Sequence, residues 1–265
     1  LIALTLGLLF QIIQGVSFLE CLAHYATGII YSNSLFYNGE LNPLLFVSWT
    51  LEIEIQFYLL APLLCKIFTL RSSTLRYLIL LSSIYIVYSC VNHLGHQFPS
   101  GIWSRSILGQ LQFFLAGLLL GDIYLKFWKE RSNSTCSALV FDAIGIAAWL
   151  FIPFALKING SHSWLAYLLL IAFTCILRGR LLKSLLSLPL IATIGGMCYS
   201  IYLFHGHILY FLHINFITPI FGLQKGNWPF NLVPLTLLIT LTLFACSLAY
   251  YYIERPSMRW GSKKS

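Results

Sequence analysis

Charged side chains are scarce in this sequence. Only 9% of its 265 residues are Asp, Glu, Lys or Arg, whereas a soluble domain carries about 25%. Hydrophobic residues make up 58%, which is more apolar surface than a soluble fold of this length can bury. The net charge of +8 is spread over this apolar chain rather than gathered in basic patches, which excludes nucleic acid as a partner. The composition therefore indicates a polytopic membrane protein.

Alternation of polar and apolar residues is also absent. Each strand of a transmembrane β-barrel needs such alternation over about 10 residues, but the apolar runs 113–121 and 232–249 are unbroken. The sequence thus predicts an all-α integral membrane bundle of about eight transmembrane helices. The stretch 20–47 is predicted to be a long outer loop with room for one re-entrant or interfacial helix. The expected spans are 1–19, 48–68, 75–92, 106–126, 138–156, 164–177, 189–212 and 232–253.

Basic residues are nearly absent from every second connection between the spans. The positive-inside rule places the basic connections in the cytoplasm. Both chain ends are then expected to be cytoplasmic, with Asn42 outside. The connections with few basic residues hold only Arg105, Lys157 and Lys225. Thirteen of the sixteen basic residues lie in the connections assigned to the cytoplasm and in the C-terminal tail: Lys66, Arg71, Arg76, Lys126, Lys129, Arg131, Arg178, Arg180, Lys183, Arg255, Arg259, Lys263 and Lys264.

Metal-ligand and disulfide patterns are missing. The seven cysteines form no C-x-x-C pair, and we interpret them as small buried apolar residues. The histidine pairs at 93–96 and 205–207 lack a third ligand at a recognisable spacing, so no bound metal or cofactor is expected. Gly117 and Gly121 are four residues apart, which predicts a place where helices approach closely.

Two carboxylates enter the membrane in the second span. Such a group costs about 2.5–3.5 kcal/mol on insertion scales and is a functional candidate by default. At about 100° per residue, Glu52 and Glu54 point to roughly opposite sides, and Glu54 shares a face with Phe57 and Tyr58. The alternative is that both lie at the outer interface marked by Trp49 and extend into water. We favour a site role for Glu54 and the interfacial role for Glu52.

The seventh span places a phenol and an imidazole on one stripe. Cys198, Tyr202 and His205 are spaced to share a helical face, and the last two can share a proton or hold a substrate hydroxyl. An interfacial aromatic belt explains Tyr199 and Tyr202 equally well. At the end of the last span, residues 254–256 also fit a helix stop with interfacial charges.

Three motifs together point to a known family. Residues 48–62 read S-W-T-L-x-x-E-x-x-F-Y-L-x-x-P, residues 195–205 read G-G-M-C-Y-S-I-Y-L-F-H, and residues 254–256 read E-R-P. The first resembles S-W-S-L-x-x-E-x-x-F-Y-L-x-x-P, the second G-x-x-S-Y-S-x-Y-L-x-H, and the third E-[KR]-P, which are motifs of the acyltransferase 3 family of multi-pass membrane O-acyltransferases acting on sugars. Residues 105–117 also fit this family's R-x-x-x-F-x-x-G-like span. The motifs stand in family order over nearly the whole chain.

The resemblance implies an O-acyltransferase in a bacterial inner membrane. An acyl group, acetyl in the first place, would pass from cytoplasmic acyl-CoA to a hydroxyl of a glycan, lipid-linked sugar or exported molecule. Acyl-CoA is then a donor substrate and no cofactor is bound. Supporting catalytic roles fall to Glu54, Tyr202 and His205. Substrate-binding roles fall to Trp49, Tyr58, Ser200, Glu254 and Arg255.

The chain departs from the family pattern in several places. Cys198 stands where Ser is usual, Gly206-His207 where Trp-Pro is common, and Glu52 where a small polar residue is usual. Family members usually have about ten spans, and the first carries the His thought to be catalytic. We therefore expect residues 1–265 to form a single acyltransferase-like membrane domain that begins at the family's third span. Its principal base would lie outside these residues, and the chain alone would be inactive.

Two other classes stay open. One is a catalytically inactive relative that serves as a membrane scaffold. The other is a transporter-like protein, although the internal repeats and matching broken helices typical of transporters are not visible. For Arg178 and Arg180, attraction of the CoA phosphates and a role in topology alone are both open.

Overall fold

A computed structural model describes residues 1–95, 100–128, 135–157, 162–221 and 232–262. Within these ranges all regular structure is helical, which confirms the predicted all-α fold. The described chain divides into two compact units. Unit 1 holds Leu1–Tyr25, Pro43–Val47 and Pro189–Ser265, and unit 2 holds Ala26–Asn42 and Ser48–Leu188. The prediction of a single domain stays a prediction. Several residues used above lie outside the described ranges: His96, Lys129, Arg131, Lys225, Lys263 and Lys264.

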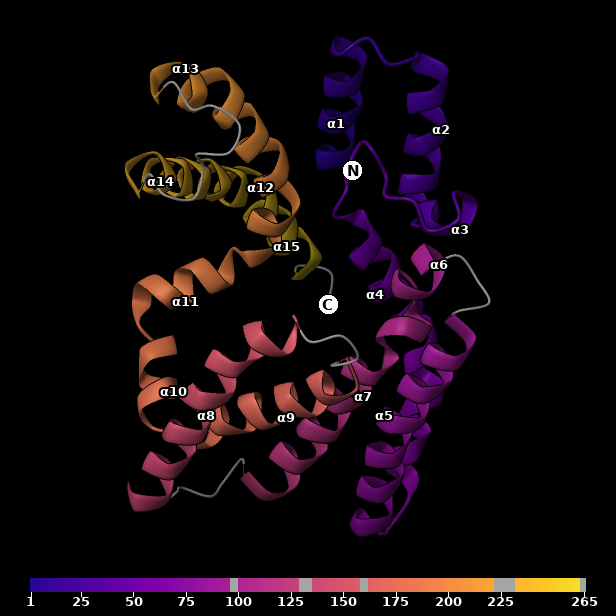
Figure 1. Ribbon diagram of the computed structural model, residues 1–265, viewed down its shortest axis with the longest axis vertical. Coiled ribbons are helices and arrows are strands. Elements are labelled where there is room, and N and C mark those ends of the chain that lie inside the picture. The colour runs from indigo at the N-terminus through magenta and orange to yellow at the C-terminus, as the bar shows by residue number, and fades with distance from the viewer. Residues whose placement is uncertain (96–99, 129–134, 158–161, 222–231, 263–265) are drawn as a thin grey trace. The chain divides into compact units, whose positions relative to one another are not determined.

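Unit 2 consists of apolar helices that pack along one another. Helix α5 runs beside α7, and α8 runs beside α9 (Figure 1). The buried core between them is made of aliphatic side chains, namely Leu80, Ile84, Leu115, Ala116, Leu119 and Ala166. The helices are α3 (Asn33–Phe36), α4 (Ser48–Leu64), the 3₁₀ helix η1 (Cys65–Thr69), α5 (Ser73–Gly95), α6 (Ser100–Ser104), α7 (Ile107–Ile123), the π-helical turn η2 (Tyr124–Trp128), α8 (Thr135–Ala155), α9 (His162–Arg178) and α10 (Leu181–Leu186).

Unit 1 brings the two ends of the chain together with a short segment. We call this segment, Pro43–Val47, the strap. Leu44, Leu45 and Val47 of the strap share a core with Ala3 and Leu4. Helix α12 packs against α14 (Figure 1). The helices are α1 (Ile2–Ile13), α2 (Phe18–Ile29, whose last turn belongs to unit 2), α11 (Pro189–Gly196), α12 (Cys198–Leu212), the π-helical turn η3 (His213–Ile217), α13 (Thr218–Phe221), α14 (Leu232–Ala249), the π-helical turn η5 (Tyr250–Glu254) and α15 (Arg255–Ser262).

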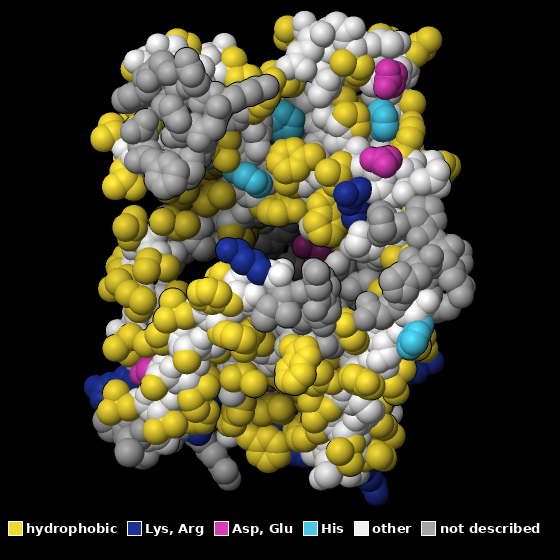
Figure 2. Space-filling model, in the orientation of Figure 1, with side chains coloured by type: hydrophobic (Ala, Val, Ile, Leu, Met, Phe, Trp, Pro, Cys, Tyr) yellow, Lys and Arg dark blue, Asp and Glu magenta, His cyan; other side chains and the backbone are white. Residues whose placement is uncertain are grey.

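Membrane-spanning helices are recognisable by their length and composition. Two shorter apolar helices, Ile2–Ile13 and Trp164–Arg178, coincide with the first and sixth predicted spans. Most side chains on the face shown in Figure 2 are hydrophobic, as expected for a surface in lipid. Four segments are long and apolar enough to cross a bilayer and confirm the third, fourth, fifth and eighth predicted spans: Ser73–Val91, Ile102–Trp128, Ser137–Ala155 and Leu232–Met258.

Two predicted spans are wrong as single straight helices. The first ends at Ile13, and Gly15 then turns the chain with φ +85° before α2 begins, a conformation that glycine adopts without strain. The seventh is divided at Met197, with φ −104° and ψ 17°, into α11 and α12. Glycines 195 and 196 precede the division, and glycine weakens a helix by about 1 kcal/mol relative to alanine. The stretch 20–47 contains parts of both α2 and α3, one helix more than predicted.

Two interpretations of small residues are also corrected. A Cβ atom added at Gly117 or Gly121 would meet nothing within 4 Å, so neither glycine permits a close helix contact among the described residues. The cysteines are not uniformly buried: Cys65, Cys90 and Cys198 are exposed, while Cys21, Cys175 and Cys246 are buried. In a chain that faces lipid, an apolar side chain has no need to enter the protein core.

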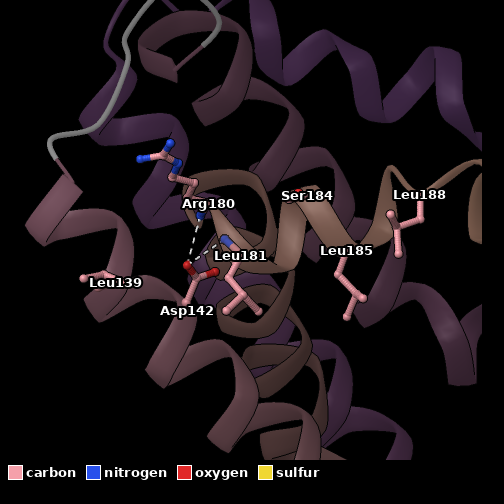
Figure 3. A pocket seen from close by; sticks show the side chains of 7 residues that line it. All are labelled: Leu139, Asp142, Arg180, Leu181, Ser184, Leu185 and Leu188. Atoms are coloured by element: carbon pink, nitrogen blue, oxygen red, sulfur yellow. Dashed lines mark hydrogen bonds between the residues drawn. The ribbon is translucent and has the colours of Figure 1, made fainter.

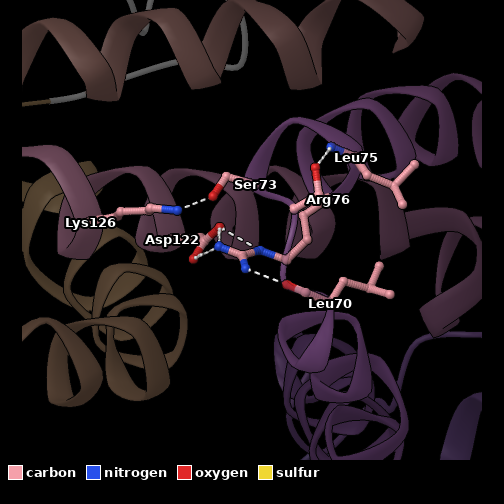
Figure 4. A network of polar contacts seen from close by, with 7 residues as sticks. Leu70, Ser73, Leu75, Arg76, Asp122 and Lys126 are labelled. Atoms are coloured by element: carbon pink, nitrogen blue, oxygen red, sulfur yellow. Dashed lines mark hydrogen bonds and ion pairs between the residues drawn. The ribbon is translucent and has the colours of Figure 1, made fainter.

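Three contacts join segments that the predicted topology places on the same side, whereas Ala3 and Leu4, at the predicted inner end of the first span, share a core with the strap. In unit 2, the inner ends of α5 and α7 meet through Arg76 and Asp122 (Figure 4), whereas on the outer side the Arg105 side chain donates to the Gly39 carbonyl. In unit 1, the Gln11 amide at the outer end of α1 donates to the Pro43 carbonyl at 3.1 Å. The three contacts agree with the alternation between connections that hold many basic residues and connections that hold few.

The topology predicts which introduced thiols a membrane-impermeant maleimide reaches. Asn42 is only 2% exposed, so the exposed Asn38 on the same outer segment is the better position. In intact cells, Asn38→Cys should be labelled, while the exposed Lys183→Cys should be labelled only after permeabilisation. Labelling of Lys183→Cys in intact cells would contradict the assigned orientation.

The ion pair at the inner end of unit 2 is a buried clamp. Two guanidinium nitrogens of Arg76 donate to Asp122 at 2.7–3.0 Å, and the third donates to the Leu70 carbonyl at 2.8 Å (Figure 4). The two side chains are only 10% and 14% exposed. Each of the three guanidinium nitrogens thus has a partner, and the pair fastens the start of α5 to the end of α7.

Replacing Asp122 by Asn should therefore destabilise unit 2. The substitution leaves a buried guanidinium without its counter-charge, and we expect a loss of about 3 kcal/mol in the free energy of unfolding. Lys126→Gln, at the same end of α7, is the control, because the exposed Lys126 donates only to the Ser73 hydroxyl and should contribute about 1 kcal/mol or less. Unfolding in detergent would measure both; equal losses would show that the pair does not act as a clamp.

Candidate active site

Helix α4 presents the first motif in unit 2. Trp49 is half-buried, and Glu54 and Tyr58, one turn apart, are both exposed. Between them, the Phe57 ring stacks on Phe114 of α7, with centroids 4.1 Å apart and an interplanar angle of 16°. Gln56, on the same helix, accepts a hydrogen bond from the Ile107 backbone N–H at 2.9 Å and so caps α7. The motif thus anchors α4 to α7 while leaving Glu54 accessible.

The Glu54 carboxylate has no hydrogen-bond or ion-pair partner among the described residues. The carboxylates of Glu52, Asp122, Asp142 and Glu254, which are buried or half-buried, each have one, whereas Glu54 is exposed. An unpartnered carboxylate in a membrane protein is expensive, so its retention is typical of a group that acts on something the chain itself does not provide. This observation agrees with the predicted site role of Glu54, which stays a prediction.

Glu52 occupies the opposite side of α4 and does not extend into water. Its side chain is 1% exposed, and its Oε2 accepts a hydrogen bond from the Ser34 backbone N–H at the start of α3, at 2.9 Å. The interfacial interpretation of Glu52 is therefore wrong. The physical reason is that segment 26–42 folds over this side of α4, held by further bonds such as Asn33 Nδ2 to the Glu40 carbonyl at 3.1 Å.

Glu52→Gln should lower stability, whereas Glu54→Gln should not. At position 52 the amide loses the charge-assisted bond to Ser34 and buries an NH₂ group without a partner, a cost of about 1–2 kcal/mol. At position 54 no interaction within the described chain is lost. Thermal unfolding of the two variants in detergent would compare them on one helix, two residues apart. A wild-type melting temperature for Glu52→Gln would refute the capping role.

In unit 1, the structure joins the second motif to the third. Glu254, at the end of η5, accepts hydrogen bonds from the Ser200 backbone N–H at 3.1 Å and from the Ser200 hydroxyl at 2.5 Å. Ser200 is 2% exposed. Arg255 is exposed and lies over the Tyr251 ring, 5.9 Å from its centroid. The Ser200–Glu254 pair thus ties the start of α12 to the end of η5, which is a structural role for two residues predicted to bind substrate.

Tyr202 and His205 lie together on α12, as the spacing predicts. Their ring centroids are 6.1 Å apart. The Tyr202 hydroxyl donates to the Val47 carbonyl of the strap at 3.0 Å. His205 Nδ1 lies 2.9 Å from the Ile201 carbonyl and 2.8 Å from that of Tyr202. Carbonyls only accept, so Nδ1 carries the hydrogen and Nε2 of the neutral ring is left as the proton acceptor.

Trp49, Glu54 and Tyr58 belong to unit 2, whereas Tyr202, His205 and the Ser200–Glu254 pair belong to unit 1. The structure therefore brings the predicted residues together in two groups. Within the described residues no three His, Cys, Asp or Glu side chains gather as metal ligands.

A cavity of about 460 Å³ lies beside α8 and α10 in unit 2 (Figure 3). Asp142 in its wall is 4% exposed and accepts the backbone N–H groups of Arg180, Leu181 and Leu182 at 2.8–3.1 Å. Gly179 is required here, because an added Cβ would lie 2.2 Å from Asp142 Oδ1. No sequence motif marks Asp142; the glycine directly after the end of α9 is the one local signal of this contact.

The two arginines beside this cavity differ. The Arg178 guanidinium lies over the rings of Trp128 and Phe141, 5.5 and 5.8 Å from their centroids. Arg180 is exposed, lines the cavity with Ser184 and four leucines, and its guanidinium has no partner among the described residues. Arg180 is therefore the one of the pair whose charge is available to a ligand.

Fold and sites together define a polytopic, all-helical membrane protein with hydroxyl, imidazole and carboxylate groups on its apolar helices. Comparison with known sequences makes the assignment specific. Residues 1–252 match the acyltransferase 3 family, described as an acyltransferase domain, and the chain belongs to this family.

Two bacterial relatives illustrate the family. The O-acetyltransferase OatA of Staphylococcus aureus is 27% identical over 232 residues, which cover 81% of this chain and 36% of OatA. A putative O-acetyltransferase of Staphylococcus aureus strain COL is 25% identical over 238 residues, with the same shares. The chain thus spans little more than a third of the length of these relatives. No solved structure matches it.

Proposed function

We propose that this protein is a membrane O-acyltransferase that moves an acyl group, acetyl in the first place, from cytoplasmic acyl-CoA to a hydroxyl group of a glycan, lipid-linked sugar or exported molecule. Membership of the acyltransferase family supports the reaction class, and the O-acetyltransferase names of two relatives support acetyl as the group. The observation that carries the proposal is the orientation of His205, whose Nε2 is left as an acceptor beside a phenol.

The chemistry requires a hydroxyl to attack a thioester carbonyl. The hydroxyl oxygen forms the new ester bond, the C–S bond breaks, and the hydroxyl proton leaves through a base while the CoA thiolate is released. His205 Nε2 is suited to accept a hydrogen bond from the acceptor hydroxyl, with Tyr202 beside it. Glu54, free of other partners, would stabilise the charged form of the principal base or line the acceptor site. Trp49 and Tyr58 on its helix would contact the acceptor.

The donor would approach from the cytoplasmic side. Arg180 lies in a connection that the topology assigns to the cytoplasm, lines the cavity with Ser184, and has an available guanidinium group. Its charge would attract the CoA phosphates, while the neighbouring leucines offer an apolar wall. The position of Arg178 between two aromatic rings suits it to packing and topology instead.

The acceptor is found most directly by mass spectrometry of surface glycans and lipids from cells with and without the full-length gene. We expect an ester mass, 42 Da for acetyl, to disappear with the gene. Glu54→Gln in the full-length protein should reduce this transfer by about 10²-fold, the usual size of a general acid–base contribution. Glu40→Gln, which neutralises an exposed carboxylate on the outer segment, is the control.

Both variants should insert and express normally, because neither exchange adds charge to the membrane. Wild-type transfer by Glu54→Gln would remove Glu54 from the site. Identical ester content with and without the gene would contradict the proposed activity and favour a scaffold role.

A further inference from the structure

The strap Pro43–Val47 is an irregular segment that is buried at Leu44, Leu45 and Val47 and exposed at Pro43 and Phe46. Side chains of other elements hold it. Its carbonyls accept hydrogen bonds from Gln11 at Pro43, from His207 at Leu44 and from Tyr202 at Val47, at 3.0–3.1 Å. Leu44 is 0% exposed and Val47 6%. A buried carbonyl outside a helix needs a donor in place of water, so these side-chain donors help to determine where the strap lies.

His207 supplies the central one of these donors. Its Nε2 lies 3.0 Å from the Leu44 carbonyl, and because a carbonyl only accepts, Nε2 must carry a hydrogen. The Phe10 ring meets the imidazole edge-on, with centroids 6.4 Å apart. The imidazole is therefore fixed between α1 and the strap, with its N–H aimed at the strap backbone.

Two glycines give the strap room to approach so closely. A Cβ added at Gly7 would lie 1.8 Å from the Leu44 carbonyl oxygen, and one added at Gly206 would lie 2.2 Å from Cε1 of Phe46. A larger side chain at 206 would take the space of the Phe46 ring, so the glycine permits the strap contacts seen here.

We propose that His207 is a positioning residue for the acyl-transfer site, acting through the strap. By holding Leu44, it keeps the Val47 carbonyl where the Tyr202 hydroxyl can donate to it, which fixes the phenol next to His205. The strap also leads directly into Ser48 and Trp49 of the first motif. This inference rests on the proposed function, because it assigns His207 to the support of Tyr202.

Three substitutions of His207 in the full-length protein separate the loss of the hydrogen bond to Leu44 from a change in side-chain size. His207→Leu removes the donor; His207→Asn keeps an amide but is too short to place it at Nε2; His207→Gln places an amide N–H close to the Nε2 position. We expect kcat for transfer from acetyl-CoA to fall about tenfold in the Leu and Asn variants, as for loss of one hydrogen bond. The Gln variant should stay within about threefold of wild type, and KM for acetyl-CoA should hold in all three.

A second readout follows the strap itself and does not require activity. Leu45 is 5% exposed, so a thiol introduced by Leu45→Cys should react slowly with maleimide in the wild-type and His207→Gln backgrounds. In the His207→Leu and His207→Asn backgrounds it should react about tenfold faster, because the strap loses its central hydrogen bond.

The transfer kinetics and the thiol labelling together distinguish a failure of the proposed function from a failure of the role proposed for His207. A wild-type protein that transfers no acyl group refutes the proposed function, while the thiol labelling still tests the strap. Unchanged labelling in both His207→Leu and His207→Asn overturns the inference. Faster labelling with unchanged kcat shows that His207 holds the strap without positioning the site, which also overturns it. Should His207→Leu fail to insert, the comparison of the polar Asn and Gln variants decides.

Discussion

A carboxylate on an apolar chain must find a partner within that chain, and this requirement organises much of the structure. Asp122 is paired with Arg76, Asp142 with backbone N–H groups at the start of α10, Glu254 with Ser200, and Glu52 with the start of α3. Each of these bonds joins segments far apart in the sequence. In a chain with only eight acidic residues, these four each fasten their own element to the start of another helix. Among the described residues Glu54 departs from this pattern, and it is a candidate site residue in the proposed function.

The same requirement applies to backbone carbonyls outside helices. The strap satisfies its carbonyls with side chains from α1 and α12. Residues of the second motif make two contacts with other segments. Ser200 donates to Glu254 of the third motif, and Tyr202 donates to the carbonyl of Val47, the residue before the first motif. Residues of the motifs therefore form a hydrogen-bond framework in this chain, in which Tyr202 takes part.

Sequence patterns predicted the features that depend on local composition. Long apolar runs identified four of the spans, and the spacing of Tyr202 and His205 placed both on one face of α12. The burial of Glu52 escaped prediction, because it depends on how a distant loop folds over α4. The division at Met197 was missed for a different reason: two glycines were read as part of a motif rather than as weak helix formers. Bonds to carbonyls, such as that of His207 to Leu44, leave no trace in a side-chain pattern.

Among the described residues Glu54 is exposed and has no partner, whereas Glu52, two residues away, is a buried cap. Modification of the full-length protein with dicyclohexylcarbodiimide, an apolar reagent that attacks accessible carboxyl groups in membranes, compares the two on one helix. Peptide mass spectrometry should find the adduct on Glu54, with loss of acyl transfer in proportion, and none on Glu52. An adduct on Glu52, or an unreactive Glu54 in protein whose transfer persists, would contradict this account.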